Sequence, residues 1–351
     1  MHLQLGELPT VVVATADLAQ EVFKTHDLLF LYRPQSQTTK IVCYDWNDLA
    51  FAPYGDYRRE LRKICTLQLL SSKRVNLEVL SMIIGLEPKL EKLHRIHDKI
   101  FDDIIRENLE NKGKFANERS SEFEEDLVEV LITLQEGTEL QTQIAMDNIK
   151  AVIMDIFIAG TETSSSIVEW AMAEMMRNQR VLKEAQTEVR RAMQGKAAVD
   201  EAEIQELTYV KSVIKETPRL HPSLPLLLPR KCREACEISG YVIRKEPKDP
   251  KSWPDAESIV TERFDGISAD FNGNNFEFIP FGAGRRICHG VSFGMANIEL
   301  MLAHLLYCFD WELPYGIKSE ELDMKESFGS TVRRQNDLYL IPTPYCPSLE
   351  K

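Results

Sequence analysis

The longest periodic pattern in the sequence begins near Gln143 and continues through Ala171. Within this segment, apolar residues recur at spacings of three and four, the repeat that keeps side chains on one face of an α-helix. The residues on this face are Ile149, Val152, Ile153, Ile156, Phe157 and Gly160. The pattern predicts one long helix, and helical patterns dominate most of the remaining chain.

Four residues that weaken a helix lie together at the centre of this pattern, within the segment AGTETS at 159–164. Glycine is a weak helix former, and the hydroxyls of Thr and Ser compete for backbone carbonyls. We therefore expect the helix to open locally. Two interpretations remain open: the hydroxyls simply bond back to carbonyls, or the groove accepts a small ligand, with Thr163 and Glu162 forming a proton path.

Shorter patterns flank the central segment, and no repeat or linker divides the chain into separate domains. The predicted elements are a short strand at 11–13, helices at 17–24, 57–69, 87–110 and 291–306, a helix that begins at a Thr208 N-cap and ends before Pro222, and a loop at 113–122.

The composition limits the classes of function that the chain can have. A net charge of −13 and a pI near 5.2 argue against a nucleic-acid-binding protein, which needs basic surface to neutralise phosphates. Seven cysteines scattered over 351 residues indicate a reducing compartment rather than a disulfide scaffold. No apolar run approaches the ~18 residues of a membrane span, and no signal peptide is visible. Taken literally, the sequence predicts a cytosolic chain.

A lone cysteine stands in the glycine-rich stretch FGAGRRICHG at 281–290. The stretch lacks the Lys-Ser/Thr of a phosphate-binding loop, and no dinucleotide-binding spacing supports a nucleotide site. Glycines let the backbone fold tightly beneath a flat ligand, while positive charge and backbone N–H groups favour the thiolate of Cys288 over the thiol. A thiolate held in this way can be the axial ligand of haem iron.

The sequence resembles the plant microsomal branch of the cytochromes P450 over nearly its whole length. The matching elements occur in the family's order: 159–164 on the central helix, Glu216-x-x-Arg219, the Pro/Leu-rich run 222–229, Glu262-Arg263-Phe264 and the cysteine loop. The resemblance implies the cytochrome P450 fold, mainly α with small β-sheets. It also implies a single haem-binding monooxygenase domain over residues 1–351.

The resemblance implies heme b as the cofactor, with Cys288 as the proximal ligand of the iron. It further implies that Thr163 and Glu162 deliver protons to dioxygen. The other cofactor-binding residues would be Phe281 near the sulfur, Gly282 and Gly290 in the loop, and Arg286, Arg62 and Arg230 on the haem propionates. Glu216, Arg219 and Arg263 would form a structural ion cluster behind the cysteine loop.

The implied reaction inserts one oxygen atom of O2 into a small apolar organic substrate, in plant specialised metabolism. Electrons would come from NADPH through NADPH-cytochrome P450 reductase. The substrate would be contacted by the loop at 36–41, the helix near Ala159, residues 226–228 and the turn at 329–332. By family, the location would be the cytosolic face of the endoplasmic reticulum membrane.

The sequence departs from the family in several places. The expected N-terminal membrane anchor does not precede the first strand. Helices of the distal roof are missing after Arg74, and a sheet strand is missing between 243 and 249, which would expose a neighbouring strand edge. Arg58 stands where the family has a tryptophan that bonds a propionate. Pro218 lies inside the Glu216–Arg219 helix, where a proline costs about 3 kcal/mol and is expected to kink the helix and strain the pair.

Three hypotheses follow from these features. The chain is a haem-thiolate monooxygenase, or it is a catalytically silent, truncated member of the same family with impaired haem binding. The third hypothesis is a helical scaffold that binds a metal at Cys232 and Cys236, although the spacing and the lack of a second cysteine pair favour an exposed strand there.

Overall fold

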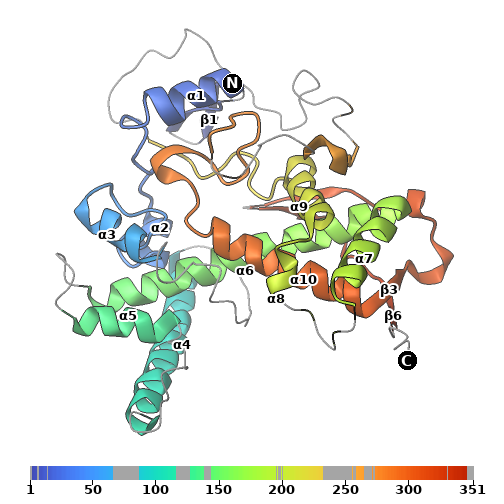
Figure 1. Cartoon of the computed structure of the whole chain (residues 1–351). Helices are drawn as coiled ribbons and strands as arrows, with labels where there is room; N and C mark the ends of the chain where they lie inside the picture. Colours follow the sequence, from blue (N-terminus) through green and yellow to red (C-terminus); the bar gives the residue numbers. More distant parts are fainter. Residues whose placement is uncertain are drawn as a thin grey trace. The chain divides into compact units, whose positions relative to one another are not determined.

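The structure is a computed structural model, and its described residues group into two compact units (Figure 1). Unit 1 comprises 1–27, 162–228 and 236–351, and unit 2 comprises 28–161 and 229–235. The described residues are 2–5, 8–13, 15–65, 87–115, 127–137, 144–194, 196, 199, 201–231, 255, 258–264, 271, 273–329 and 331–345. Cys232, Cys236 and both sites of the predicted internal deletions lie outside these residues.

Unit 2 is helical throughout its described elements. They are α2 (Gln37–Val42), α3 (Asp56–Ile64), α4 (Glu87–Phe115), α5 (Leu127–Glu136) and the first half of α6 (Met146–Arg177). The helices predicted at 57–69 and 87–110 are confirmed where they are described. The loop predicted at 113–122 was wrong at its start, because α4 continues to Phe115.

The segment expected to be a loop at 36–41 is helical instead. Ser36 is the N-cap of α2, and its hydroxyl accepts a hydrogen bond of 3.1 Å from the Thr39 backbone N–H. The Thr39 hydroxyl in turn accepts from the Ser36 backbone N–H at 3.1 Å, which completes a capping box. The two hydroxyls satisfy N–H groups that would otherwise lack partners, so the segment begins a helix.

The central helix α6 does not open at its polar segment, contrary to our expectation. It is continuous from Met146 to Arg177. The Ser165 hydroxyl donates to the Glu162 carbonyl at 3.1 Å, three residues earlier, in the manner of a serine that bonds back within a helix. A Cβ placed on Gly160 would meet nothing within 4 Å. The glycine therefore leaves space beside the helix while the backbone hydrogen bonds continue.

Two carboxyl groups lie buried together where α6 packs within unit 2. Asp155 accepts hydrogen bonds from the backbone N–H groups of Leu49 at 2.7 Å and Ala50 at 3.1 Å. Burial, followed by the nearby charge of Asp48, raises the pKa of Asp155 well above its usual value. Asp48 is itself buried and accepts from the Phe51 N–H at 3.0 Å. The fold thus favours the protonated form of Asp155.

The raised pKa of Asp155 predicts that the chain loses stability as the pH rises. The unfolded chain releases this proton near pH 3.9 and the folded chain retains it, so the free energy of unfolding falls between that pH and the folded pKa. We expect Asp155→Asn to keep both backbone hydrogen bonds, to raise stability at pH 8 by about 1 kcal/mol or more, and to flatten the pH dependence. Urea unfolding between pH 5 and 8 measures both effects.

Two comparisons make this test specific. Asp155→Leu removes the acceptor of two backbone N–H groups and is expected to cost about 2–4 kcal/mol. Asp103→Asn removes a carboxylate from the surface of α4, where it pairs with Arg106, and is expected to cost no more than about 1 kcal/mol. An equal pH slope in wild type and Asp155→Asn would contradict the assignment.

Unit 1 contains the remaining helices and three two-stranded antiparallel sheets in its described part. Strand β1 (His2–Leu5) pairs with β2 (Leu8–Val11), β3 (Phe309–Glu312) with β6 (Ile341–Pro344), and β4 (Glu326–Phe328) with β5 (Val332–Arg334). The helices are α1 (Ala16–Gln20) followed by a π-helical turn (Glu21–Thr25), α7 (Gln179–Ala192), α8 (Glu201–Ile204), α9 (Thr208–Leu220) and α10 (Val291–Cys308).

The main hydrophobic core of unit 1 lies among the second half of α6 and helices α7 to α10. Helix α10 contacts α7, α8 and α9, and α7 contacts α9. The fully buried members include Ala171, Met175, Ala185, Val189, Ile214, Leu302, Ala303 and Leu306. These residues recur every three or four positions on their helices, which is the amphipathic repeat that places one stripe of each helix against the core.

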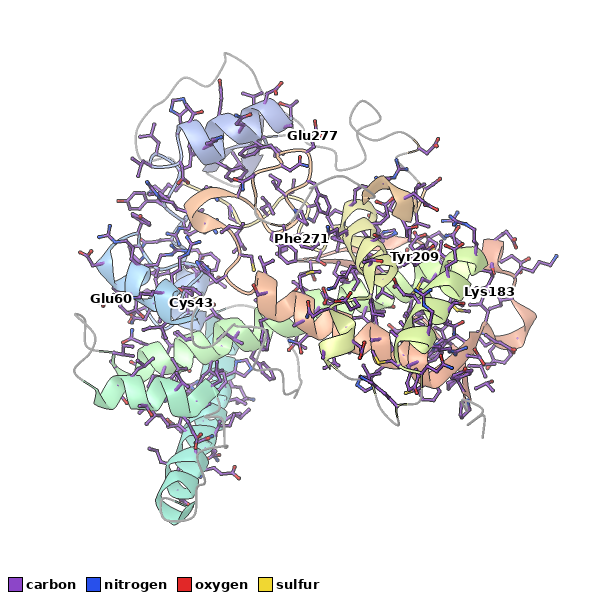
Figure 2. The ribbon with its side chains drawn as sticks, in the orientation of Figure 1. Cys43, Glu60, Lys183, Tyr209, Phe271 and Glu277 are labelled. Atoms are coloured by element: carbon purple, nitrogen blue, oxygen red, sulfur yellow. The ribbon has the colours of Figure 1, made fainter. Side chains whose placement is uncertain are left out.

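The first backbone N–H groups of helix α9 are capped by a side chain from another helix, and not by the residue at its own N-cap position. Thr208 was predicted as the N-cap, but it is the first helical residue, and Leu207 at the cap position offers no side-chain bond. Glu188 of α7 accepts from the backbone N–H groups of Tyr209 and Val210 at 2.9 Å and from the Thr208 hydroxyl at 3.1 Å. Figure 2 labels Tyr209 on α9 and Lys183 on the neighbouring α7.

Candidate functional site

The cysteine loop is a tight turn that leads directly into α10. A 3-10 turn (Gly284–Arg286) precedes Cys288, and the Cys288 backbone N–H donates to the Phe281 carbonyl at 2.9 Å. The Gly294 N–H donates to the Gly290 carbonyl at 2.7 Å, in the first turn of α10. These bonds place Cys288 three residues before Val291, the first residue of α10, at the end of the helix whose first backbone N–H groups have no partner within the helix.

Two glycines of this loop are needed for its backbone conformation. Gly284 has a φ of +69°, and a Cβ there would lie 2.4 Å from the Phe23 carbonyl oxygen. Gly282 has a φ of +74°, in the region that favours glycine. A Cβ on Gly290 would lie 3.9 Å from the Cys288 Sγ. Gly284 and Gly282 thus fix the backbone of the turn, whereas a Cβ at Gly290 would make only an ordinary van der Waals contact with the sulfur.

The Cys288 side chain is solvent-exposed, yet burial raises its pKa above the usual thiol value. Solvent reaches the sulfur from one side, while protein atoms surround it on the others. The Gly290 backbone N–H opposes the effect of burial and lowers the pKa. The expectation that the loop alone favours the thiolate was therefore wrong, and loss of the proton has to accompany metal binding.

The other residues predicted to bind the cofactor have different surroundings. The Phe281 ring meets Phe271 edge to face, with ring centroids 5.0 Å apart, and Figure 2 labels Phe271. Arg286 is buried. Arg62 on α3 and Arg230 belong to unit 2 and are both half-buried. Their pairing with propionates, like that of Arg286, stays a prediction.

The residue that replaces the family's tryptophan lies inside unit 2. Arg58 of α3 is buried, and its Nε donates to the Leu49 carbonyl at 3.2 Å. Leu49 therefore accepts a hydrogen bond from Arg58 through its carbonyl and donates one to Asp155 through its N–H. Both bonds lie within unit 2 and join its segments.

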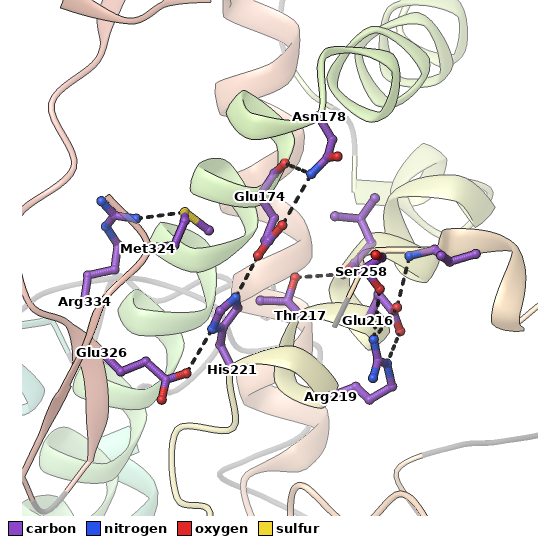
Figure 3. Close-up of polar contacts among 12 residues, drawn as sticks. Glu174, Asn178, Glu216, Thr217, Arg219, His221, Ser258, Met324, Glu326 and Arg334 are labelled. Carbon is purple, nitrogen blue, oxygen red and sulfur yellow. Dashed lines mark hydrogen bonds and ion pairs between the residues drawn. The ribbon is translucent and has the colours of Figure 1, made fainter. Parts of the chain in front are cut away.

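The predicted ion cluster is formed and deeply buried (Figure 3). Glu216 accepts from Arg219 Nε at 2.6 Å and Nη2 at 2.8 Å, and from Arg263 Nε at 3.1 Å. It also accepts from the Val260 backbone N–H at 3.0 Å. Arg219 and Arg263 donate further to the carbonyls of Ser258 and Asp255 at 3.1 and 2.6 Å. A buried carboxylate with this many donors is compensated for its loss of water.

Pro218 does not disturb this cluster, contrary to our expectation. It lies inside α9 two residues from the end of the helix, and the Glu216–Arg219 pair on either side has short, bidentate geometry. The hydrogen bond that proline cannot donate is lost only in the last turn, where the chain is about to leave the helix. The α9 C-terminus therefore accepts the proline without separating the pair.

The predicted proton-path residues lie side by side on α6. Thr163 is half-buried and Glu162 is exposed. The Glu162 carboxylate accepts a hydrogen bond from the hydroxyl of Thr331, which precedes β5. Sequence analysis missed Thr331 as a partner of the acid, because 168 residues separate them and no short-range pattern links them.

A second buried polar group was also missed by sequence analysis. His221, at the C-terminus of α9, has Nε2 2.8 Å from Glu174 of α6 and Nδ1 3.3 Å from Glu326 of β4 (Figure 3). Its ring stacks on Trp170 with centroids 3.7 Å apart and an interplanar angle of 3°. The signal in the sequence was the acidic Glu174 inside the apolar run 170–176, which requires a buried polar partner.

Comparison with known proteins identifies the family. The family model of cytochrome P450 matches residues 77–340, which is more than half of the chain. The chain is a cytochrome P450. As a member of this family it is a haem-thiolate monooxygenase, and its related enzymes include plant oxygenases and hydroxylases of secondary metabolism. The hypothesis of an unrelated helical metal scaffold was therefore wrong.

Several plant enzymes are similar to this cytochrome P450 over nearly its whole length. Desmethyl-deoxy-podophyllotoxin synthase from Sinopodophyllum hexandrum is 45% identical over 428 aligned positions, which cover 98% of this chain and 84% of the relative. Premnaspirodiene oxygenase from Hyoscyamus muticus is 42% identical, with 100% and 87% covered. These alignments are longer than the 351 residues of the chain, so the relatives contain internal segments that it lacks.

Solved structures confirm the predicted fold of this cytochrome P450. A zebrafish cytochrome P450 with abiraterone has a TM-score of 0.77 at 21% identity, covering 99% of this chain and 96% of that chain. A zebrafish cytochrome P450 with progesterone has a TM-score of 0.70 at 20% identity, covering 98% and 96%. The mainly α fold with small β-sheets is thus confirmed.

Two described helices of this cytochrome P450, α6 and α10, have the length and mean hydropathy of a membrane span. Both contribute to the core of unit 1, as apolar core helices do. In the part of the chain that the structure describes, no three or more His, Cys, Asp or Glu side chains lie close enough together to bind a metal ion. A haem iron with one protein ligand needs no such group.

Proposed function

We propose that this chain inserts one oxygen atom of O2 into a small apolar organic substrate of plant specialised metabolism. Electrons come from NADPH through NADPH-cytochrome P450 reductase. The observation that carries the proposal is the exposed Cys288 thiol in a glycine loop at the start of α10, in a chain of the cytochrome P450 family. The donor set fits haem, because a single accessible thiol in a narrow loop is the ligand that a haem-thiolate protein requires.

Within this proposal, heme b supplies the chemistry of oxygen activation when it is bound. Cys288 holds the iron, and Phe281, Gly282 and Gly290 shape the loop around the sulfur. Arg286, Arg62 and Arg230 neutralise the two propionates, for which a guanidinium is well suited because it donates two parallel N–H bonds to a carboxylate. The fixed turn at Gly282 and Gly284 holds the sulfur without a rearrangement of the backbone.

The residues of α6 and α9 have separate roles in the proposal. Thr163 holds water with its hydroxyl, and Glu162, which is exposed, takes protons from solvent and passes them toward Thr163. Glu216, Arg219 and Arg263 support the cysteine loop from behind and do not take part in proton transfer. Their burial and many hydrogen bonds favour a structural role, since a proton relay needs contact with water.

The names of the relatives support a small, largely apolar substrate. Premnaspirodiene oxygenase and 5-epiaristolochene 1,3-dihydroxylase from Nicotiana tabacum are named for the compounds they oxidise. The second relative is 42% identical to this chain, with 100% of this chain and 87% of the relative covered. Substrate contacts come from α6 near Ala159, residues 226–228 and the turn at 329–332.

The domain organisation is part of the same proposal. Residues 1–351 form one haem-binding domain that acts at the cytosolic face of the endoplasmic reticulum membrane and lacks parts of the distal helices and of the sheet found in its relatives. Support for the internal losses comes from the alignments, which extend over 428 to 438 positions against 351 residues in this chain.

The missing internal segments also favour a second candidate function. A chain that lacks parts of the distal roof exposes the haem face to water and loses substrate contacts, so a catalytically silent member with impaired haem binding is the alternative. The two candidates differ in a measurable property. The first requires stable haem, and the second predicts that haem is lost on purification.

The experiment that separates the candidates is absorption spectroscopy of the purified full chain. The chain is expressed with a haem precursor, reduced and exposed to carbon monoxide. We expect a Soret band with the red shift typical of thiolate ligation, and NADPH oxidation when the reductase is added. A colourless chain, or one without the red-shifted band, would contradict the monooxygenase and support the silent member.

A further inference from the structure

The Glu162 carboxylate is held by one hydroxyl from a distant part of unit 1. Thr331 donates its hydroxyl hydrogen to Glu162 Oε1. Glu162 is exposed on α6, whereas Thr331 is buried, with 8% of its surface accessible. The rigid partner in this contact is therefore Thr331, and the side chain whose freedom the contact limits is Glu162.

The backbone around Thr331 is fixed to two other segments. The Val332 N–H donates to the Ser223 carbonyl at 2.8 Å, and the Val332 carbonyl accepts from the Ser166 hydroxyl of α6 at 3.4 Å. The Gly329 N–H donates to the Thr331 carbonyl at 3.1 Å, which closes the turn between β4 and β5. The Thr331 hydroxyl is thus presented to α6 by a backbone with little freedom to move.

The strands on both sides of this turn are anchored as well, and Figure 3 shows the contact of Glu326 with His221. Arg334 of β5 has Nε 3.3 Å from Glu169 of α6, and its guanidinium lies 5.4 Å from the Trp170 ring centroid. Glu326 of β4 lies 3.3 Å from His221. Both strands of the hairpin are therefore bound to α6 or to the end of α9, which places the turn by more than one contact.

A hydrogen bond to a carboxylate is stronger than one between neutral groups, and it selects one rotamer of a long side chain. Without Thr331, the exposed Glu162 side chain would be free to turn toward solvent. With it, the carboxylate is held beside Thr331, on the same turn of α6 as Thr163. A proton donor must stay within hydrogen-bond reach of its acceptor, directly or through one water, to act in catalysis.

We propose that Thr331 is a positioning residue that holds Glu162 for proton delivery, an inference that rests on the proposed role of Glu162 and Thr163. The balanced productive reaction is RH + O2 + NADPH + H⁺ → ROH + H2O + NADP⁺. When protons are delivered poorly, the two electrons leave instead in O2 + NADPH + H⁺ → H2O2 + NADP⁺. Thr331 is neither oxidised nor consumed. It changes only the fraction of NADPH that is used to form product and the fraction that is used to form H2O2.

The first test compares Thr331→Val, which keeps the shape and removes the hydroxyl, with Thr331→Ser, which keeps the hydroxyl. The haem-loaded chain is assayed with reductase, NADPH and O2, and H2O2 is measured per NADPH consumed. We expect the H2O2 share to rise about threefold or more in Thr331→Val and to return toward wild type in Thr331→Ser. Thr187→Val controls for the substitution itself, because the Thr187 hydroxyl donates to the Lys183 carbonyl within α7 at 2.7 Å.

Two further readouts separate positioning from general damage. The solvent deuterium isotope effect on NADPH oxidation is expected to increase in Thr331→Val. Cumene hydroperoxide supplies oxygen that is already reduced, so oxidation driven by it needs neither NADPH nor the reductase. We expect the rate of this reaction to change by a smaller factor in Thr331→Val than the H2O2 share does. Equal H2O2 shares in Thr331→Val and Thr331→Ser would overturn the proposal.

The second test reads the contact without catalysis. Urea unfolding midpoints are measured for the full chain, Glu162→Ala, Thr331→Val and the double variant. We expect the double variant to lose no more than the larger of the two single losses, because either change removes the same bond. Additive losses would overturn the contact. If the chain never binds haem, the proposed function and the proposed role of Thr331 in proton delivery both fail. Non-additive losses of stability in the four proteins would still establish the hydrogen bond between Thr331 and Glu162.

Discussion

Replacing Glu216 with alanine is expected to destabilise unit 1 by about 3–5 kcal/mol, because it leaves two buried guanidinium groups without their carboxylate. Glu216 has no accessible surface, and Arg219 has 1%. The change also removes the acceptor of the Val260 N–H. A loss of this size is comparable with the whole stability of many domains, so the expected result is a chain that is largely unfolded or insoluble at 37 °C.

The comparison for this prediction is the neighbouring acidic residue. Glu262 pairs with Arg180 at 3.0 Å, but both side chains are about half exposed. Glu262→Ala is therefore expected to cost no more than about 1 kcal/mol. Urea unfolding or, for insoluble variants, the soluble fraction at 20 °C provides the measurement. Similar losses for the two variants would show that the buried cluster is not the cause.

A triple variant distinguishes loss of charge balance from loss of packing. Replacing Glu216, Arg219 and Arg263 together with apolar residues of similar size removes every charge from the buried site. If uncompensated charge causes the loss in Glu216→Ala, the triple variant should recover a large part of it. If the cluster supports the cysteine loop by its geometry, the triple variant should fold but bind haem less tightly than wild type.

Replacing Cys288 with serine is expected to abolish thiolate ligation of haem completely. A serine hydroxyl does not give up its proton at neutral pH and is a poor ligand for this iron, so the red-shifted carbon monoxide band should disappear. Stability without haem should change little, because the side chain is exposed and replaced by one of similar size. Absorption spectra with and without hemin, at equal protein concentration, provide the measurement.

Cys308 offers a matched control for the cysteine prediction. It is a free, partly buried cysteine at the C-terminal end of α10, the helix that begins just after Cys288. Cys308→Ser is expected to retain the thiolate band. Retention of that band in Cys288→Ser, or its loss in Cys308→Ser, would contradict the assignment of the ligand.

Sequence reasoning succeeded where the signal lies within one element. The apolar repeat predicted α6 and α10, and the three-residue spacing of Glu216 and Arg219 placed the pair on one face of α9. Propensity failed at 159–164, because tertiary packing keeps a poor helix-forming segment helical. The expectation that Pro218 would strain the pair was likewise wrong, because a proline in the last turn of α9 removes a hydrogen bond only where the chain is about to leave the helix.

Contacts between distant segments could not be predicted in the same way. Thr331 meets Glu162, and Glu188 meets the start of α9, only after the helices and the hairpin have packed. The role of Asp155 has a similar origin, because its raised pKa depends on a loop more than 100 positions earlier in the chain. An acidic residue in an apolar stretch does reveal that a partner exists, without revealing which one.

The dependence of α9 on Glu188 has a consequence for recombination between homologous enzymes. A chimera whose crossover lies between α7 and α9 takes the carboxylate from one parent and the backbone N–H groups that it binds from the other. Libraries that exchange 179–220 as one block preserve this match, together with the Glu216–Arg219 pair in the second helix.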